Sequence, residues 1–264
     1  MRNSAWLLAF LLLPQLATAH DYWIESTVLS PANQPRLQSR LYLGDGLKVE
    51  EEQPYKPGRA SDFRLYVRDE SQRDRVIDLR QGATAVRTPM LDMPFKAQSG
   101  LLRLDRTPAY LDATPADFRH NLEHEQQLTG FAFPLPQKNV RERYTRYLKS
   151  LVGNGAGLHA RETGQRLEIS LLDNPVAASS GGLVRVRVRF EGSALAGAPL
   201  LAYRRDARGA ITTQELRTDA RGQARLQLDG KGLWLVRMMH LRPCARDCKG
   251  VEWESFWAAY SFRR

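Results

Sequence analysis

His20 is the residue with the widest scope for chemistry, because the chain before it has the pattern of a secretory signal peptide. Arg2 precedes an apolar run over residues 5–13, and the small residues Ala-Thr-Ala end at residue 19. One basic residue, an apolar segment too short to span a bilayer and an Ala-x-Ala site predict cleavage after Ala19. Residues 1–19 are therefore expected to be removed, which would leave His20 as the first residue of a periplasmic protein.

A histidine at the N-terminus offers a metal ion two nitrogen ligands, the α-amine and the imidazole. Both nitrogens bind a metal only when deprotonated, and ordinary pKa values of about 8 and about 6.5 bring them near that state at neutral pH. The alternative is that His20 comes first by chance and has no metal role.

His240 is the candidate partner for His20, because it ends an apolar strand pattern over residues 233–240. Alternation along that strand puts Met238 and His240 on one otherwise apolar face. If His20 and His240 meet, an amine and two imidazoles make a nitrogen site suited to copper(II) or nickel(II), and Met238 is a weaker candidate for a sulfur ligand. The alternative is a half-buried histidine that hydrogen-bonds a neighbour.

Cys244 and Cys248 are the two cysteines of the chain. In an oxidising compartment, a close pair predicts a disulfide that closes one loop. His240, Cys244 and Cys248 could also be three ligands of a metal site, but zinc sites usually have a tighter cysteine spacing and a fourth ligand. The disulfide is the favoured prediction.

The segment His120-Asn-Leu-Glu-His124 matches the H-x-x-E-H pattern, in which two histidines one helical turn apart bind zinc and the glutamate is a general base. The charged and amide residues around it are typical of a solvated helix face, and no downstream acid completes a zinc site. His159 follows a glycine-rich loop and is expected to be a loop histidine. No nucleophile elbow or phosphate-binding loop accompanies these residues, so the sequence favours a protein that is not an enzyme.

The charge balance is basic, with 39 Lys and Arg against 29 Asp and Glu. The arginines are scattered through strand-like alternations such as residues 185–189, which is typical of a solvated strand face and does not indicate a nucleic-acid site. After residue 19 no apolar run is long enough to span a membrane, so no transmembrane segment is expected in the processed chain.

Short apolar alternations separated by Gly and Pro predict a mainly β protein. Residues 20–175 are expected to form a β-rich N-terminal domain. A break over residues 173–182 contains the expected domain boundary. The second domain, residues 176–264, has strands at regular spacing from residue 183 onward, which predict an immunoglobulin-like or transthyretin-like β-sandwich.

A helical insertion is expected over residues 114–152. Thr114 as N-cap, Pro115 at the first helical position and Asp117 in the capping-box position predict a helix that runs to about Leu128. Apolar residues spaced near 3.6 predict a second helix over residues 140–152.

The chain resembles the DUF4198 family, exported proteins grouped with periplasmic components of nickel and cobalt uptake systems. The matching segments run in order over nearly the whole processed chain: residues 20–25, 41–46, 141–149, 164–169, 197–200, 218–222, 232–236 with His240, and 253–257. The resemblance implies a β-rich N-terminal part, an immunoglobulin-like domain and a role in binding or delivering a transition metal. It also implies His20 and His240 as the ligands.

Three functions remain open from the sequence. The first is a periplasmic protein that holds nickel, cobalt or copper and passes it to membrane metal-uptake components or another envelope protein. The second is a copper-dependent oxidative enzyme built on the same terminal histidine. The third is a metal-free envelope interaction module.

Overall fold

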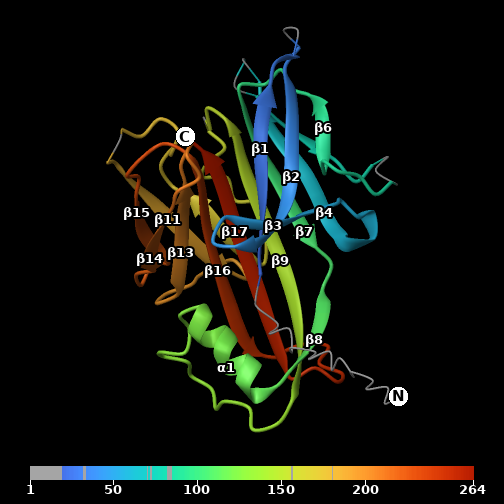
Figure 1. The fold of residues 1–264 in the computed structure, drawn as a ribbon, viewed down its shortest axis with the longest axis vertical. Coiled ribbons are helices and arrows are strands. Elements are labelled where there is room, and N and C mark those ends of the chain that lie inside the picture. Colours follow the sequence, from blue (N-terminus) through green and yellow to red (C-terminus); the bar gives the residue numbers. More distant parts are fainter. Residues whose placement is uncertain are drawn as a thin grey trace, which may run out of the picture.

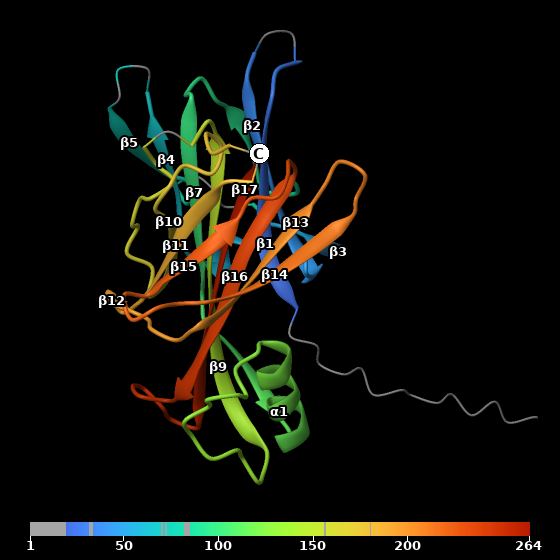
Figure 2. The same cartoon turned by 90° about the vertical axis from the view of Figure 1, so that its left-hand side faces the viewer.

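The computed structural model describes residues 20–264 apart from residues 32–33, 70, 72, 82–84, 156 and 180. The predicted signal peptide lies outside the described residues. A sheet of nine strands forms the centre of the molecule, with a four-stranded sheet on each of its faces (Figures 1 and 2). The prediction of a mainly β protein with a sandwich arrangement is confirmed.

The central sheet joins strands from both halves of the chain, and its only parallel pair among the described residues is β17 with β9. Its path is β14 (Ile211–Arg217), β13 (Pro199–Arg205), β16 (Leu233–Pro243), β17 (Trp253–Arg263), β9 (Val140–Gly153), β7 (Ser99–Arg106), β4 (Ala60–Arg68) and β5 (Asp74–Asp78), with β8 (Ala109–Ala113) beside β9.

The two outer sheets each cover one face of the central sheet. One contains β1 (Asp21–Leu29), β2 (Arg36–Asp45), β3 (Lys48–Gln53) and β6 (Leu91–Pro94). The other contains β10 (Leu167–Leu171), β11 (Leu183–Phe190), β12 (Ser193–Ala194) and β15 (Gln223–Gln227). A short 3₁₀ helix, Pro57–Arg59, precedes β4.

Strand β16 shows how one strand serves two cores. Trp234, Val236 and Met238 pack toward the sheet that contains β11, whereas Leu233 and Leu235 pack toward the sheet that contains β1. This is the alternation expected of a strand with both faces buried. The predicted division of β16 into two faces is confirmed.

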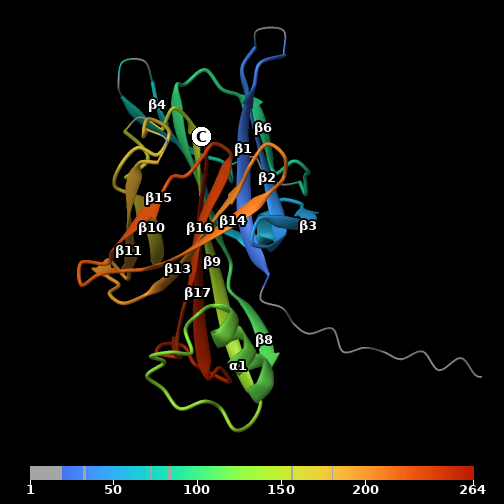
Figure 3. The ribbon, with the colours of Figure 1, turned by 60° about the vertical axis from the view of Figure 1, so that its left-hand side comes forward.

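The α-helix α1, Pro115–His124, lies at the end of the molecule beside β8 and covers a third, smaller core (Figure 3). Its N-terminus is as predicted: the Thr114 hydroxyl accepts from the amide of Asp117, and the Asp117 carboxylate accepts from the amide of Thr114. The helix ends at His124, one turn earlier than the predicted Leu128.

The predicted helix over residues 140–152 is wrong, because this segment is the long strand β9. Tyr147 and Leu151 pack into the core beneath β11, whereas Leu148 and Val152 pack into the core beneath β1. A strand buried on both faces has apolar residues at spacings that also fit a helical stripe, so periodicity alone did not distinguish the two.

The predicted boundary between residues 175 and 176 lies between β10 and β11, which pair with each other. The division of the chain into two domains there stays a prediction. No helix of the described residues is long and apolar enough to cross a membrane.

Candidate functional site

His20 lies just before β1, at a cavity of about 300 Å³ between the start of β1, helix α1 and strands β8 and β9. Its Nε2 is 2.8 Å from a carboxylate oxygen of Glu50 on β3, and both side chains are partly exposed. The cavity is lined by His20, Tyr22, Leu43, Leu111, Asp112, Ala113, Asp117, Asn121, Glu142, Tyr144, Arg146 and Trp257. The first residue of the predicted processed chain is therefore built into a ligand-sized recess.

A buried ion network fixes the start of β1 next to His20. The Asp21 carboxylate is 2.8 Å from Nε of Arg237 on β16 and accepts a 3.0 Å hydrogen bond from the Gly46 amide. Arg237 also pairs with the buried carboxylate of Glu125. Burial raises the pKa of Asp21 to about 6, and the neighbouring Arg237 opposes that rise. These contacts hold the backbone that carries His20 against the central sheet.

Arg146 lies among three aromatic rings in the cavity wall. Its guanidinium carbon is 4.4 Å from the ring centre of Tyr22, 4.6 Å from that of Tyr144 and 5.7 Å from that of Trp257. Cation–π contacts of this kind hold a charged side chain in place without neutralising it. Arg146 therefore adds one positive charge to a cavity wall that also contains Asp112, Asp117 and Glu142.

Glu142 places one buried carboxyl in the cavity wall. It accepts a hydrogen bond from the Ser255 hydroxyl, and burial raises its pKa above the ordinary value. The raised pKa favours the protonated form, so Glu142 has less negative charge to offer a cation than an exposed glutamate.

His240 lies on the opposite face of the central sheet from His20. Its ring centre is 4.4 Å from that of Phe190 and 6.4 Å from that of Phe256. Phe256 and Trp257 are consecutive on β17, so their side chains point to opposite faces, and it is Trp257 that lines the His20 cavity. The structure thus does not bring His20 and His240 together, and Met238 is buried in the core on the His240 face.

His240 is half-buried and neutral, and its protonation should lower the stability of the folded chain in acid. Burial lowers the pKa of His240 to about 4, and nearby Arg242 acts in the same direction. The unfolded chain takes up a proton at this histidine near pH 6.5, whereas the folded chain takes it up only near pH 4. The free energy of unfolding is therefore not reduced by this group above about pH 6.5, and it falls as the pH drops toward 4. We expect His240→Phe to be more stable than the parent at pH 5 by about 1–2 kcal/mol and not at pH 8. Urea unfolding of the variant and the parent at pH 5 and pH 8 measures the difference in their free energies of unfolding. An equal difference at the two pH values would contradict the prediction.

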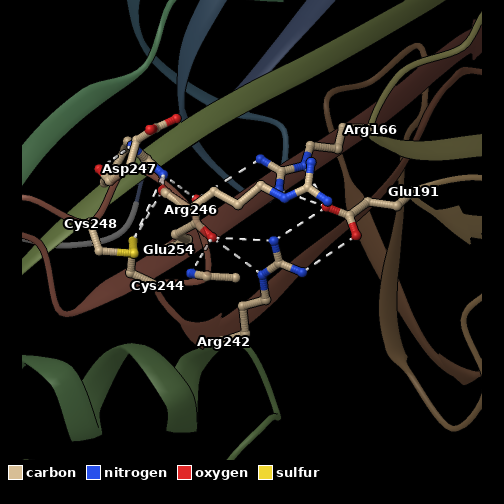
Figure 4. Close-up of a disulfide and its surroundings, with 10 residues drawn as sticks. Arg166, Glu191, Arg242, Cys244, Arg246, Asp247, Cys248 and Glu254 are labelled. Carbon is tan, nitrogen blue, oxygen red and sulfur yellow. Dashed lines mark hydrogen bonds and ion pairs between the residues drawn. A yellow bond between two sulfur atoms is a disulfide. The ribbon is translucent and has the colours of Figure 1, made fainter.

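The predicted disulfide between Cys244 and Cys248 is confirmed, with the two Cα atoms 5.6 Å apart. Because both sulfurs are in this bond, they are not thiolate ligands of a metal with His240. The disulfide loop lies beside a charged cluster (Figure 4). In that cluster Glu254 pairs with Arg143 and Arg242, and Glu191 pairs with Arg166 and Arg242.

The H-x-x-E-H segment lies on α1 as predicted, but its histidines have different surroundings. His120 is exposed, whereas His124 pairs with Glu125 through Nδ1 at 3.0 Å and with Asp45 through Nε2 at 3.6 Å. The Glu125 hydrogen bond raises the pKa of His124. The part of the chain that the structure describes holds no group of three or more His, Cys, Asp or Glu side chains suited to a metal ion.

Glu50 and Arg146 are among the residues of the site that the sequence does not identify. Glu50 belongs to an acidic run that resembles a solvated strand, although the Asp45-Gly46 pair is a sequence signal for a hairpin that would fold it back beside β2. The sequence pattern places Arg146 on a helix, whereas it lies on β9. Its contact with Tyr22 on β1 joins two strands far apart in the chain, and no local sequence signal predicts it.

The fold and site define a β-sandwich protein with a ligand-sized cavity beside its first strand. The chain belongs to the family described as "Domain of unknown function (DUF4198)", whose model matches residues 17–242. The resemblance found in the sequence motifs is therefore confirmed. No curated protein matches the chain.

Proposed function

We propose that the processed protein is a periplasmic binding protein for a nickel, cobalt or copper ion. His20 holds the ion through its α-amine and Nδ1, and the protein passes it to a membrane metal-uptake component. The observation that carries this proposal is the 2.8 Å contact between Nε2 of His20 and the Glu50 carboxylate.

The Glu50 contact selects the ring tautomer that a terminal chelate needs. A carboxylate accepts a hydrogen bond from the Nε2–H group. In a neutral ring with its proton on Nε2, the lone pair that can bind a metal is on Nδ1. Nδ1 is also the nitrogen that can close a small chelate ring with the α-amine of the same residue. Metal-binding histidines commonly donate their other ring N–H to a carboxylate, which orients the ring and increases its basicity.

The donor set fits a transition metal held for transfer. An amine and an imidazole suit nickel, copper and cobalt, and neither is a strong ligand for magnesium or calcium. Since His240 lies across the central sheet, it is not part of the proposed site. Two protein nitrogens leave the other coordination positions of the ion to water or to an external small molecule. Such a site releases its ion more readily than one in which the protein supplies every ligand.

The chelate is tested by the position of the N-terminus. The full-length chain is expressed, processed and purified, and its affinity for nickel, cobalt and copper is compared with that of a form carrying one extra alanine before His20. The extra residue converts the α-amine into an amide, which is not basic at neutral pH. We expect a loss of at least tenfold in metal affinity, whereas equal affinities would overturn the chelate.

Glu50→Gln tests the orienting carboxylate without touching a metal ligand. We expect it to weaken metal binding by about 10–100-fold, the range found for carboxylates that support a ligating histidine. Glu51→Gln is the matched control, because Glu51 is exposed on the same strand and does not line the cavity. Isothermal titration measures both variants, and equal losses would show that only the overall charge matters.

A further inference from the structure

A second cavity of about 560 Å³ lies against the first, on the other side of Tyr22 and Arg146. It is lined by residues of β1, β7, β8 and β9 and of the segment before β4. Its lining residues are Tyr22, Lys56, Arg59, Arg106, Thr107, Pro108, Ala109, Tyr110, Tyr144 and Arg146. Four of these side chains are cations, three are tyrosines, and none is an aspartate or glutamate.

The four cations differ from most arginines of this protein, which form ion pairs with carboxylates. Among the described residues, no ion pair joins Lys56, Arg59, Arg106 or Arg146 to an aspartate or glutamate. Positive charge in a cavity whose lining contains no carboxylate attracts anions, and the low-dielectric walls of a cavity strengthen that attraction.

Arg106 and Arg146 contact the same tyrosine ring although their charges repel each other. Their guanidinium carbons lie 4.9 Å and 4.4 Å from the centre of the same Tyr22 ring. Burial lowers the pKa of Arg106, and the charge of Arg146 adds to that effect. The Nε of Arg146 is buried and makes no hydrogen bond within the part of the chain described. An anion that contacts both guanidinium groups would relieve the repulsion and supply hydrogen-bond acceptors.

We infer that this cavity binds a small oxyanion with more than one negative charge, either a polycarboxylate or a phosphate compound. Arg106 and Arg146 contact its anionic groups, Lys56 and Arg59 stand at the more exposed side, and the tyrosine rings pack against its carbon atoms. The volume is in the range of small-molecule sites. The inference goes beyond the proposed function, since it requires no metal, although Tyr22, Tyr144 and Arg146 line both cavities and would place the anion beside His20.

The test uses metal-free processed protein obtained from the full-length chain. Isothermal titration with citrate and with inorganic phosphate measures binding at low and at moderate ionic strength. Arg106→Met removes one central cation, and Arg106→Lys keeps the charge without the planar fork. Arg221→Met is the control, because it removes the same charge from an exposed turn that does not line the cavity.

We expect at least one of the two anions to bind, with an affinity that falls as salt rises. Arg106→Met should weaken binding at least tenfold, Arg106→Lys should weaken it less, and Arg221→Met should leave it within about twofold. Binding of citrate alone assigns the site to polycarboxylates, and binding of phosphate alone assigns it to phosphate groups. Failure of both anions to bind, or equal losses in Arg106→Met and Arg221→Met, overturns the inference. Circular dichroism and thermal unfolding confirm that each variant is folded.

Discussion

Arg237→Met should lower the free energy of unfolding by about 3–5 kcal/mol, the range for removal of one partner from a buried ion pair. Arg237 is 2% exposed and pairs with the carboxylates of Asp21 and Glu125, which are themselves buried. Methionine fills much of the same volume but leaves both carboxylates without their cation. Urea unfolding at pH 7.5 measures the loss.

The control for Arg237→Met is Arg221→Met, which removes an exposed arginine and should change stability by less than about 0.5 kcal/mol. A triple variant, Arg237→Met with Asp21→Asn and Glu125→Gln, should recover part of the loss because no buried charge remains uncompensated. If Arg237→Met is no less stable than Arg221→Met, the network does not anchor the start of β1.

The Arg237 network connects the fold to the proposed function. Asp21 follows His20 directly and is tied to β16, while Glu125 follows the last residue of α1. One buried arginine thus joins the first strand, the central sheet and the helix that borders the cavity. The proposed chelate requires His20 to stay near the carboxylate that orients its ring. The buried Arg237 network fixes the backbone at Asp21 and so restrains the position of His20.

Local signals predicted the elements that depend on local contacts. The capping box of Thr114 and Asp117 involves residues three apart, so the start of α1 could be predicted from the sequence alone. The faces of β16 followed from alternation, because a strand between two layers buries both sides. The Cys244–Cys248 disulfide followed from short spacing and the expected compartment.

The missed features depend on contacts between residues far apart in the chain. β9 has its apolar residues divided between two cores, and only the sheets on either side of it show that. The separation of His20 from His240 depends on which face of β17 each approaches. That choice is made by the packing of whole sheets, and neither residue type nor spacing encodes it.

Lys149→Met should lower the free energy of unfolding by about 3–5 kcal/mol, because Lys149 is the buried partner of Glu168. Lys149 is 1% exposed on β9, and its ammonium group also donates to the carbonyl of Ile169 at 3.0 Å. Glu168 on β10 accepts from the amide of Gly164 at 3.1 Å, and Lys149 helps to lower its pKa. Urea unfolding at pH 7.5 measures the loss.

The matched control is Lys138→Met, since Lys138 is exposed and should contribute less than about 0.5 kcal/mol. Lys149→Met with Glu168→Gln should be more stable than Lys149→Met alone, because the neutral amide keeps some hydrogen bonds without an uncompensated charge. A helix over residues 140–152 would have placed Lys149 on its charged face, where its loss is nearly neutral. The size of the effect therefore distinguishes a β9 buried on both faces from the amphipathic helix that the sequence pattern also fits.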